Sequence, residues 1–445
     1  MVLNCNPVND LSKPFKRVVE DKPRQLAFEV FTEVMRNGAY SNLLLPQKLG
    51  SSGLDVRHKA FVTELLYGSI RQIGRNDFIA SKFSSKPWSE VDAPIVDCVR
   101  LGAYQLFDMR VPSHAAVDAT TNLARKVAGE SKATFVNAVM RKLANEPLEV
   151  HLRDVQDDSV SSLSIRYSHP EWIINSYRDF IQDIDELKEL LQANNTPAKP
   201  VLVAWPTKSK PSEFGGKSGN FSPYAVHIEG IPSDIPAIKE RRAGIQDEGS
   251  QVLALTFAQA ASNSKIWLDL CAGPGGKAAL LSFLANGEFL ANEVSETRAN
   301  LVSQVVKEGT KVLVGDGREI KVEVDAILAD VPCTGLGALR RRPEVRWRRS
   351  LNDLPGLTKL QLELAAHAID QLPSGGIFAY ATCSPHMAET RAQCATIERK
   401  MAVEKIDVAD FLPENLQNSV VNGYMQLWPH RHGTDAMFLA LYRKR

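Results

Sequence analysis

The sequence predicts a protein of several domains, with an all-helical front part and a later α/β domain built on a mostly parallel sheet. Three observations lead to this prediction. Apolar residues recur at helical spacing from about residue 24 to residue 145, without the alternation that is typical of strands. An apolar run at 266–270 leads through a glycine-rich turn into a helical pattern. Further short apolar segments between 287 and 381 each end in polar residues.

Length and composition are those of an ordinary globular protein. The chain has 445 residues, of which 44% are hydrophobic and 24% charged, and this length suits two or three domains. The net charge is only +1, so any binding of nucleic acid has to rely on local basic patches. The polar start of the chain lacks the apolar core of a signal peptide, and no apolar run reaches the length of a membrane span. We therefore expect a cytoplasmic protein without a membrane segment.

The six cysteines are sparse and scattered, as expected in a reducing compartment. None of them forms a Cys-x-x-Cys pair, which argues against a zinc site. We expect no bound metal.

The front part of the chain divides into a tail and a helical domain. Residues 1–20 are rich in Asn, Asp, Ser, Lys and Pro and are expected to be a flexible tail. Residues 21–150 are expected to form one compact helical core. The first helix is expected at 24–37, where Gly38 stops it. The spacing predicts further helices at 55–73, 75–84, 92–108, 114–129 and 131–145.

Residues 151–240 differ in character and are expected to be a small α/β linker module. Amphipathic helices are expected from Pro170 onwards and at 184–193. A strand follows at 200–205, and the stretch 206–223 is rich in Lys, Ser, Gly and Pro, which is typical of an exposed loop.

The α/β domain is expected to occupy 241–445. Asp247 or Glu248 can serve the positive end of its first helix. Strands are predicted at 266–270, 287–294, 312–314, 324–329 and 376–381. Because the carboxyl ends of parallel strands share one edge of a sheet, and ligands bind at that edge, the residues that end these strands are candidates for a binding site.

The turn after the first strand is built for a ligand that approaches the backbone. Gly273, Gly275 and Gly276 lack Cβ atoms, and the N-terminus of the following helix offers unpaired N–H groups. The spacing is not that of the dinucleotide motif, and no Ser or Thr follows Lys277 as in a P-loop. An acidic residue about 20 positions later, Glu293, is placed to accept hydrogen bonds from ribose hydroxyls.

Two cysteines follow neighbouring strands of the predicted sheet. A single buried cysteine is usually an inert packing residue. Cys333 and Cys383, however, both lie at strand ends beside a site of the nucleoside-binding type, which favours a chemical role.

The motifs around these residues carry a specific resemblance. Residues 270–277 (LCAGPGGK), 330–335 (DVPCTG) and 381–384 (ATCS) resemble the motifs of S-adenosylmethionine-dependent RNA cytosine-C5 methyltransferases. The helical front resembles the NusB-type RNA-binding domain, notably at 111–118 and 135–141. Together they are typical of 16S rRNA methyltransferases of the RsmB/Sun (Fmu) type, in the NOL1/NOP2/Sun family.

The resemblance covers most of 24–150 and 241–445, whereas 151–240 matches only loosely. The stretch 428–438 also resembles the last motif of the family, with Ala436 where the family more often has Gly. The resemblance implies a NusB-like helical domain followed by a Rossmann-like (class I) methyltransferase domain.

The resemblance also implies the reaction and the roles of its residues. The protein is expected to transfer a methyl group from S-adenosyl-L-methionine to C5 of a cytosine in 16S rRNA. Cys383 is implied as the nucleophile that adds to C6, and Cys333 as the residue that assists release of the methylated RNA. Asp330 is implied to hold the N3/N4 edge of the base and to touch the cofactor. We further hypothesise that nearby Lys or Arg side chains lower the pKa of Cys383.

For the cofactor, the resemblance implies a set of binding residues. The methionine end is expected to be wrapped by Cys271, Ala272, Gly273, Pro274, Gly275, Gly276 and Lys277. Glu293 is expected to hold the ribose hydroxyls with support from Arg298, and Asp316 to hold the adenine amino group.

A run of six arginines in ten positions, 340–349, follows the Cys333 motif. Arginines neutralise phosphates, and an aromatic residue can stack on an unpaired base. We therefore expect RNA contacts from this run, at Arg340, Arg341, Arg342, Arg346 and Trp347.

Three other functions remain open at this point. The same chemistry could act on tRNA, because substrate choice depends on the front domains. The chain could also be a non-catalytic RNA-binding assembly factor, although the two cysteines and the glycine turn argue against this. A small-molecule methyltransferase would leave both the arginine run and the helical domain unexplained.

Overall fold

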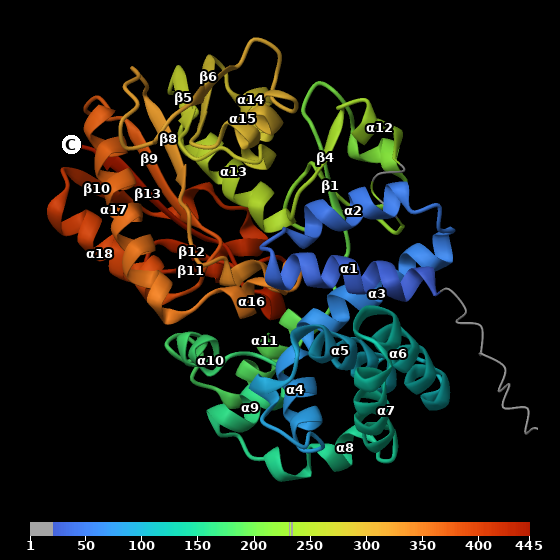
Figure 1. The fold of residues 1–445 in the computed structure, drawn as a ribbon. Coiled ribbons are helices and arrows are strands. Elements are labelled where there is room, and N and C mark those ends of the chain that lie inside the picture. Colours follow the sequence, from blue (N-terminus) through green and yellow to red (C-terminus); the bar gives the residue numbers. More distant parts are fainter. Residues whose placement is uncertain (1–20, 231, 233–234) are drawn as a thin grey trace, which may run out of the picture. The chain divides into compact units, whose positions relative to one another are not determined.

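The computed structural model describes residues 21–230, 232 and 235–445. The tail expected at 1–20 lies outside the described residues. The chain separates into two compact units, Met1–Arg153 and Asp154–Arg445 (Figure 1). The finer four-part division expected from the sequence stays a prediction.

The described part of the first unit is helical, as predicted. Its α-helices are α1 (Lys22–Arg36), α2 (Ser41–Ser51), α3 (Val56–Arg71), α4 (Ile73–Ser81), α5 (Ala93–Phe107), α6 (Ser113–Ala128), α7 (Glu130–Ala144) and α8 (Leu148–His151). The start of α1 follows from its sequence, because Asp21 accepts a hydrogen bond from the Arg24 N–H at 3.2 Å and Pro23 lies in the first turn. Helix α2 was not anticipated from the sequence, since Pro46 interrupts its pattern.

The second unit begins with three helices and a small sheet. The helices are α9 (Val160–Arg166), α10 (Glu171–Arg178) and α11 (Ile184–Asn195). The antiparallel sheet has the order β2-β3-β1-β4, with β1 (Val201–Ala204), β2 (Lys217–Ser218), β3 (Ala225–His227) and β4 (Ala243–Ile245), and α12 (Pro236–Lys239) precedes β4. The predicted strand at 200–205 therefore corresponds to β1.

The large sheet of the second unit has the strand order β11-β12-β13-β9-β8-β5-β6-β7, and β10 pairs with β13. Its parallel part consists of β5 (Ile266–Asp269), β6 (Glu288–Glu293), β7 (Lys311–Val314), β8 (Ala326–Asp330) and β9 (Ile377–Thr382). These are the strands that the sequence predicted. An antiparallel extension, which the sequence analysis did not anticipate, adds β10 (Val403–Ile406), β11 (Val420–Val421), β12 (Tyr424–Gln426) and β13 (Phe438–Lys444). The sheet is thus mostly parallel at the predicted binding edge.

Helices cover both faces of this sheet (Figure 1). The covering helices are α13 (Glu248–Ala260), α14 (Gly276–Leu284), α15 (Glu296–Ser303), α17 (Leu354–Gln371) and α18 (Arg391–Lys400). The short helices α16 (Val345–Arg348) and α19 (Pro429–His432) lie beside α10 and α11. Successive residues of β5 point to opposite faces, so Trp267 packs with Phe257 of α13, whereas Leu268 belongs to the core formed with α17 and α18. Within the described residues, no helix is long and apolar enough to cross a membrane.

The register of the parallel strands brings their carboxyl ends to one edge. Asp269 of β5 lies opposite Leu328 of β8, and Asp330 of β8 lies opposite Ala381 of β9. The loops after β5, β6, β8 and β9 therefore meet at one rim, which is the place where ligands bind in open α/β sheets.

Candidate active site at the carboxyl edge of the sheet

The glycine turn is closed against the end of β6. The Gly273 N–H donates to Glu293 Oε2 at 3.0 Å, and the Ser295 N–H donates to Glu293 Oε1 at 3.0 Å. Glu293 is buried, and Arg298 Nη2 lies 3.4 Å from its Oε2 atom. A Cβ atom on Gly273 would lie 2.2 Å from Glu293 Oε2, so this turn requires glycine. The structure thus brings together Gly273, Glu293 and Arg298.

A lysine and two carboxylates lie beside this turn. Lys277 Nζ donates to Asp330 Oδ2 at 2.7 Å. Burial lowers the pKa of Lys277, but the charge of Asp330 and this hydrogen bond outweigh it and raise the pKa overall. The ammonium group therefore stays charged, holds Asp330 and can stabilise other negative charges nearby.

Asp269, the last residue of β5, was missed in the sequence analysis. Its side chain is buried, and Oδ1 has no hydrogen-bond partner among the described residues. Burial and the charge of Asp330 raise its pKa to about 7. Its position at a strand end before the glycine turn was the signal that could have identified it. A buried acceptor without a partner suits a ligand that brings a donor group.

The expected adenine contact, Asp316, lies in the turn after β7. Its carboxylate accepts hydrogen bonds from Arg318, from Nε at 3.0 Å and from Nη2 at 2.6 Å. These bonds lower the pKa of Asp316 to about 2, so it is a carboxylate. Asn292, which the sequence analysis also missed, donates from Nδ2 to the carbonyls of Leu270 and Gly315 at 3.0 and 3.1 Å. It ties the turn after β5 to the turn after β7, so the two candidate cofactor-binding turns are mutually supported.

Cys271, Ala272, Gly275 and Gly276 belong to the same glycine turn after β5. Burial and then the nearby carboxylates raise the pKa of Cys271 well above its ordinary value. Cys271 is therefore a neutral thiol, suited to packing against a ligand. Ala272 is fixed by a hydrogen bond from its N–H to the Asn292 carbonyl at 2.8 Å, and Gly276 begins α14 after Gly275, whose φ is +113°.

The two candidate catalytic cysteines lie side by side. Cys333 follows β8 and Cys383 follows β9, and their Sγ atoms are 3.4 Å apart. The hydrogen bond from Cys333 lowers the pKa of Cys383, and Lys277 and Arg342 lower it further, against burial and Asp330. The same bond and burial raise the pKa of Cys333. Cys383 is therefore the more acidic thiol of the pair and Cys333 the less acidic one.

A tight backbone contact holds the Cys383 loop. The Gly337 N–H donates to the Cys383 carbonyl at 2.8 Å, and the Ala436 N–H donates to the Gly337 carbonyl at 2.9 Å. A Cβ atom at Gly337 would lie 2.0 Å from the Ala436 carbonyl oxygen. Glycine at 337 thus lets the turn before β13 reach the loop that carries Cys383.

Two of the arginines expected to contact RNA form a buried ionic cluster. Arg340 Nε donates to Asp435 Oδ1 at 2.9 Å, and Arg341 Nη2 donates to Asp247 Oδ2 at 2.6 Å. Asp247 also accepts from the Gly249 N–H at 2.9 Å, as a cap of α13. The exposed fractions of the two arginine side chains are 12% and 23%. Their positive charges are largely matched inside the protein.

Arg346 is fully buried. Its Nη1 atom donates to the Ser168 carbonyl at 2.9 Å and to Asn195 Oδ1 at 2.8 Å, and Nη2 donates to the Asn194 carbonyl at 3.2 Å. A phosphate cannot reach this guanidinium, so the structure gives Arg346 a packing role in place of the RNA contact expected from the charge run. Arg342 and Trp347 are half-buried.

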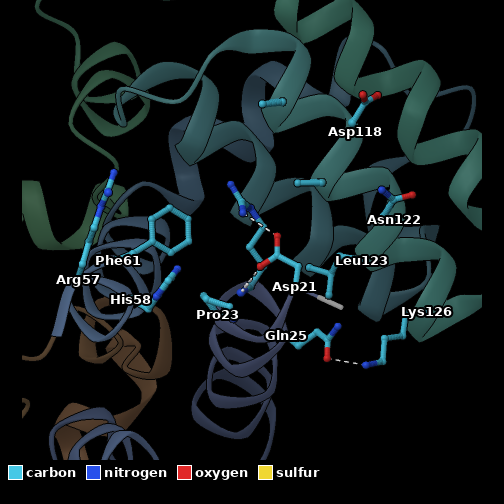
Figure 2. A pocket seen from close by; sticks show the side chains of 13 residues that line it. Asp21, Pro23, Gln25, Arg57, His58, Phe61, Asp118, Asn122, Leu123 and Lys126 are labelled. Carbon is cyan, nitrogen blue, oxygen red and sulfur yellow. Dashed lines mark hydrogen bonds and ion pairs between the residues drawn. The ribbon is translucent and has the colours of Figure 1, made fainter. Parts of the chain in front are cut away.

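Each unit also holds a cavity. The helical unit holds one of about 710 Å³, and Figure 2 shows Arg57, His58 and Phe61 on one side of it and Asn122 and Lys126 on the other. The second unit holds one of about 820 Å³ beside α11 and the Arg340–Arg341 segment. Within the described residues, no cluster of His, Cys, Asp or Glu side chains is arranged to hold a metal ion.

The chain is similar to known methyltransferases in sequence. Residues 256–443 match the family described as 16S rRNA methyltransferase RsmB/F, and residues 21–145 match the NusB family. A putative methyltransferase of Mycobacterium tuberculosis is 38% identical over 442 residues, which cover 95% of this chain and 97% of that protein. The probable ribosomal RNA small subunit methyltransferase B of Bacillus subtilis is 26% identical over 446 residues, which cover 95% of this chain and 98% of that protein.

The fold is also shared with a solved structure. The crystal structure of PH0851 superimposes with a TM-score of 0.78, at 18% sequence identity, and the match covers 96% of this chain and 99% of that one. At this identity the likeness concerns the fold, which extends over nearly the whole length of both chains.

Proposed function

Because the chain belongs to the RsmB/F family of 16S rRNA methyltransferases and carries its NusB domain, we propose that it methylates C5 of a cytosine in 16S rRNA, through a covalent bond between Cys383 and C6 of the base. The observation that carries this proposal is the pair of sulfur atoms 3.4 Å apart, in which the pKa of Cys383 is lowered and that of Cys333 is raised. A thiolate nucleophile and an adjacent proton donor are what such chemistry needs.

The cofactor is S-adenosyl-L-methionine, which supplies an electrophilic methyl group when bound. The residues present fit it. The Gly273 turn lies against the Glu293 carboxylate that is proposed to hold the ribose, and the Oδ1 atom of Asp269, without a partner among the described residues, can accept from an ammonium group. In this proposal the segment Cys271–Lys277 surrounds the methionine end, Glu293 with Arg298 holds the ribose hydroxyls, and Asp316 holds the adenine amino group.

Cytosine C5 is a poor nucleophile, and Cys383 changes this. Its thiolate adds to C6, so an S–C bond forms and the electron pair of the C5–C6 double bond becomes available at C5 for the methyl group. The C5 proton then passes to a base or to water, and its electron pair re-forms the C5–C6 double bond. The S–C bond breaks with its electrons on sulfur, so Cys383 leaves as a thiolate and the aromatic ring is restored. Lys277 favours the thiolate at both stages, since its charge lowers the pKa of Cys383.

Asp330 and Cys333 serve the base on either side of this step. Asp330 is held by Lys277 at the end of β8 and is proposed to hold the N3/N4 edge of the cytosine by accepting a hydrogen bond from the N4 amino group. Cys333 is proposed to assist release of the methylated RNA. Its raised pKa keeps its proton on sulfur beside the departing Cys383, which stabilises the leaving thiolate by a hydrogen bond.

RNA is proposed to reach the site as a single strand or a loop, because the base has to leave its stack to meet the two thiols. The positive charge of Arg342 lowers the pKa of Cys383. Because Arg342 and Trp347 are both partly exposed, we assign these two residues of the arginine run to RNA binding. Arg340 and Arg341 contribute by shaping the loop.

The test is methyl transfer from labelled S-adenosyl-L-methionine to unmodified 16S rRNA and to tRNA, followed by nucleoside analysis. We expect 5-methylcytidine in 16S rRNA and none with the C383A variant. Label in tRNA alone would support the proposed reaction but show that tRNA, and not 16S rRNA, is the substrate. No transfer to either RNA or to partly assembled ribosomal particles, by a folded protein that binds the cofactor, would favour a non-catalytic RNA-binding factor.

A further inference from the structure

Glu389 is a fully buried carboxylate that none of the steps above uses. It ends the short 3-10 turn Met387–Glu389, just before α18 and a short way after Cys383. Burying a carboxylate is costly unless hydrogen-bond donors surround it, so its contacts indicate what it is there to hold.

The carboxylate of Glu389 is bound mainly to Thr334, the residue that follows Cys333. Its Oε1 atom accepts from the Thr334 N–H at 2.9 Å, and its Oε2 atom accepts from Thr334 Oγ1 at 2.5 Å. The N–H and the hydroxyl group of Thr334 thus donate to the same carboxylate. These two bonds fix both the backbone and the side chain of Thr334, next to Cys333.

The same threonine reaches the other thiol loop. Thr334 Oγ1 lies 3.0 Å from Ser384 Oγ, and Ser384 is the residue that follows Cys383. The Ser384 N–H in turn donates to Thr382 Oγ1 at 2.8 Å. A continuous path of hydrogen bonds therefore joins the residues after the two cysteines, with Glu389 at its base.

Two further side chains hold Glu389 in place. Gln361 of α17 donates from Nε2 to Glu389 Oε1 at 3.1 Å and to the Pro332 carbonyl at 2.9 Å. Tyr380 of β9 donates to the Glu389 carbonyl at 2.8 Å. Thr334 is thus bonded to Glu389 directly, and Pro332 is linked to it through Gln361. The position of the Cys333 sulfur therefore depends on this buried network.

The charge of Glu389 acts on the pair as well. After the hydrogen bond to Cys383 and burial, the charges of Cys383 and of Glu389 contribute to the raised pKa of Cys333. The raised pKa keeps the proton on Cys333, whose sulfur lies 3.4 Å from that of Cys383.

We propose that Glu389 is a positioning residue, which fastens the Cys333 loop to the Cys383 loop through Thr334 and so keeps the two sulfur atoms within hydrogen-bonding distance. Its importance for methyl transfer rests on the proposed function, whereas its effect on the thiols does not. The two claims can therefore be tested separately.

The experiment compares Glu389→Ala, Glu389→Gln and Thr334→Val with the unaltered protein. The rate at which iodoacetamide alkylates Cys383 is measured against pH without RNA, with the modified peptide identified by mass spectrometry. Glu398→Ala is the matched control, because Glu398 of α18 accepts from Tyr424 OH at 2.6 Å and from Tyr442 OH at 3.2 Å without a bond to either thiol loop.

In E389A we expect the inflection for Cys383 to move up by about one pH unit, so that its alkylation at neutral pH slows about tenfold. In T334V we expect a shift in the same direction, since the hydroxyl link is lost. E389Q can still accept from the Thr334 N–H and donate to Thr334 Oγ1, so Cys383 should react almost as in the unaltered protein. Cys333, which loses a nearby charge, should titrate at lower pH.

In methylation assays, E389A should lower kcat about tenfold or more and leave the KM for RNA unchanged, and E389Q should recover most of the activity. An unaltered Cys383 profile in folded E389A and T334V would overturn the proposal, as would an equal effect of E398A. If E389A does not fold, the alkylation profiles of Cys383 in T334V and E389Q test the proposal instead. A shifted profile in a protein that never methylates RNA would uphold the positioning role and refute the proposed function.

Discussion

The sulfur atoms of Cys333 and Cys383 lie 3.4 Å apart, although the residues are distant in the sequence. The parallel pairing of β8 with β9, in which Asp330 lies opposite Ala381, brings the two loops together. Because one sulfur donates a hydrogen bond to the other, the two thiols have different acidities and cannot be interchanged.

The first prediction concerns the two cysteines. Cys383→Ala should lower methyl transfer on the order of a thousandfold or more, because the nucleophile is lost. In the Cys333→Ala variant, Cys383 should still attack the base, but the methylated RNA should be released slowly. A covalent protein–RNA adduct that survives denaturing electrophoresis should therefore accumulate. Cys394→Ala serves as the control, since this buried cysteine lies on the core face of α18. Adduct in C383A, or none in C333A, would contradict the assigned roles.

The second prediction concerns pH. The thiolate fraction of Cys383 rises as pH passes upward through its pKa, and this pKa is lowered, chiefly by Cys333. Alkylation of Cys383 should therefore reach half its maximal rate below the pH of an ordinary free thiol, about 8.5. In Cys333→Ala the half-maximal pH should move up. The measurement is the rate of iodoacetamide modification from pH 5 to 10, and an ordinary thiol profile in the unaltered protein would refute the prediction.

The third prediction concerns Glu293. Glu293→Gln weakens the acceptor that binds the Gly273 and Ser295 N–H groups and that is proposed to hold the ribose. The Kd for S-adenosyl-L-methionine should rise about tenfold to a hundredfold, as calorimetry can measure. Glu296→Gln, on the exposed first turn of α15, should leave the Kd unchanged. Equal Kd values for the two variants would show that Glu293 does not bind the cofactor.

The fourth prediction concerns the ionic cluster of Asp247 and Asp435 with Arg340 and Arg341. Burial alone would raise the pKa of Asp247, but the charges of Arg341 and Arg340 lower it overall. Its contribution to stability is therefore present above the carboxyl pKa of the unfolded chain and is lost as pH falls through the lower folded pKa. Asp247→Asn should reduce the free energy of unfolding at neutral pH by about 3 kcal/mol.

Asp435 provides the comparison for this cluster. Burial and the charge of Asp247 raise its pKa, so its ionisation costs stability at neutral pH. Asp435→Asn should therefore be less destabilising than Asp247→Asn in urea denaturation at pH 7. At acidic pH the difference between the two variants should shrink. The opposite order at pH 7 would show that the charges are arranged differently from this account.

The parallel strands and the residues at their ends were predictable because they depend on local patterns. An apolar run followed by a polar strand end is visible in the sequence, and parallel topology then places Glu293, Asp330 and the two cysteines at one edge. Asp269 escaped attention because its orphaned oxygen and raised pKa arise from burial among segments far apart in the chain.

The arginine run shows why charge alone is a poor guide to exposure. Arg346 looks like its neighbours in the sequence, yet its guanidinium is buried against the carbonyls that end α11 and α9. The acceptors lie more than a hundred residues away in the chain, so no local pattern marks them. Glu389 was invisible for the same reason, since its partner Thr334 belongs to another loop.

The strand that borders β9 is made late. Residues 438–444 of β13 pair with β9, and Ala436 just before them closes the path through Gly337 to the Cys383 carbonyl. A ribosome that has completed the cofactor turn and both cysteines has still to translate this segment. Until it emerges, the nascent chain presents β9 as an open, apolar sheet edge, which is the kind of surface that chaperones cover and that pairs wrongly with other chains. The backbone path from Ala436 through Gly337 to Cys383 can therefore form only after β13 has been made.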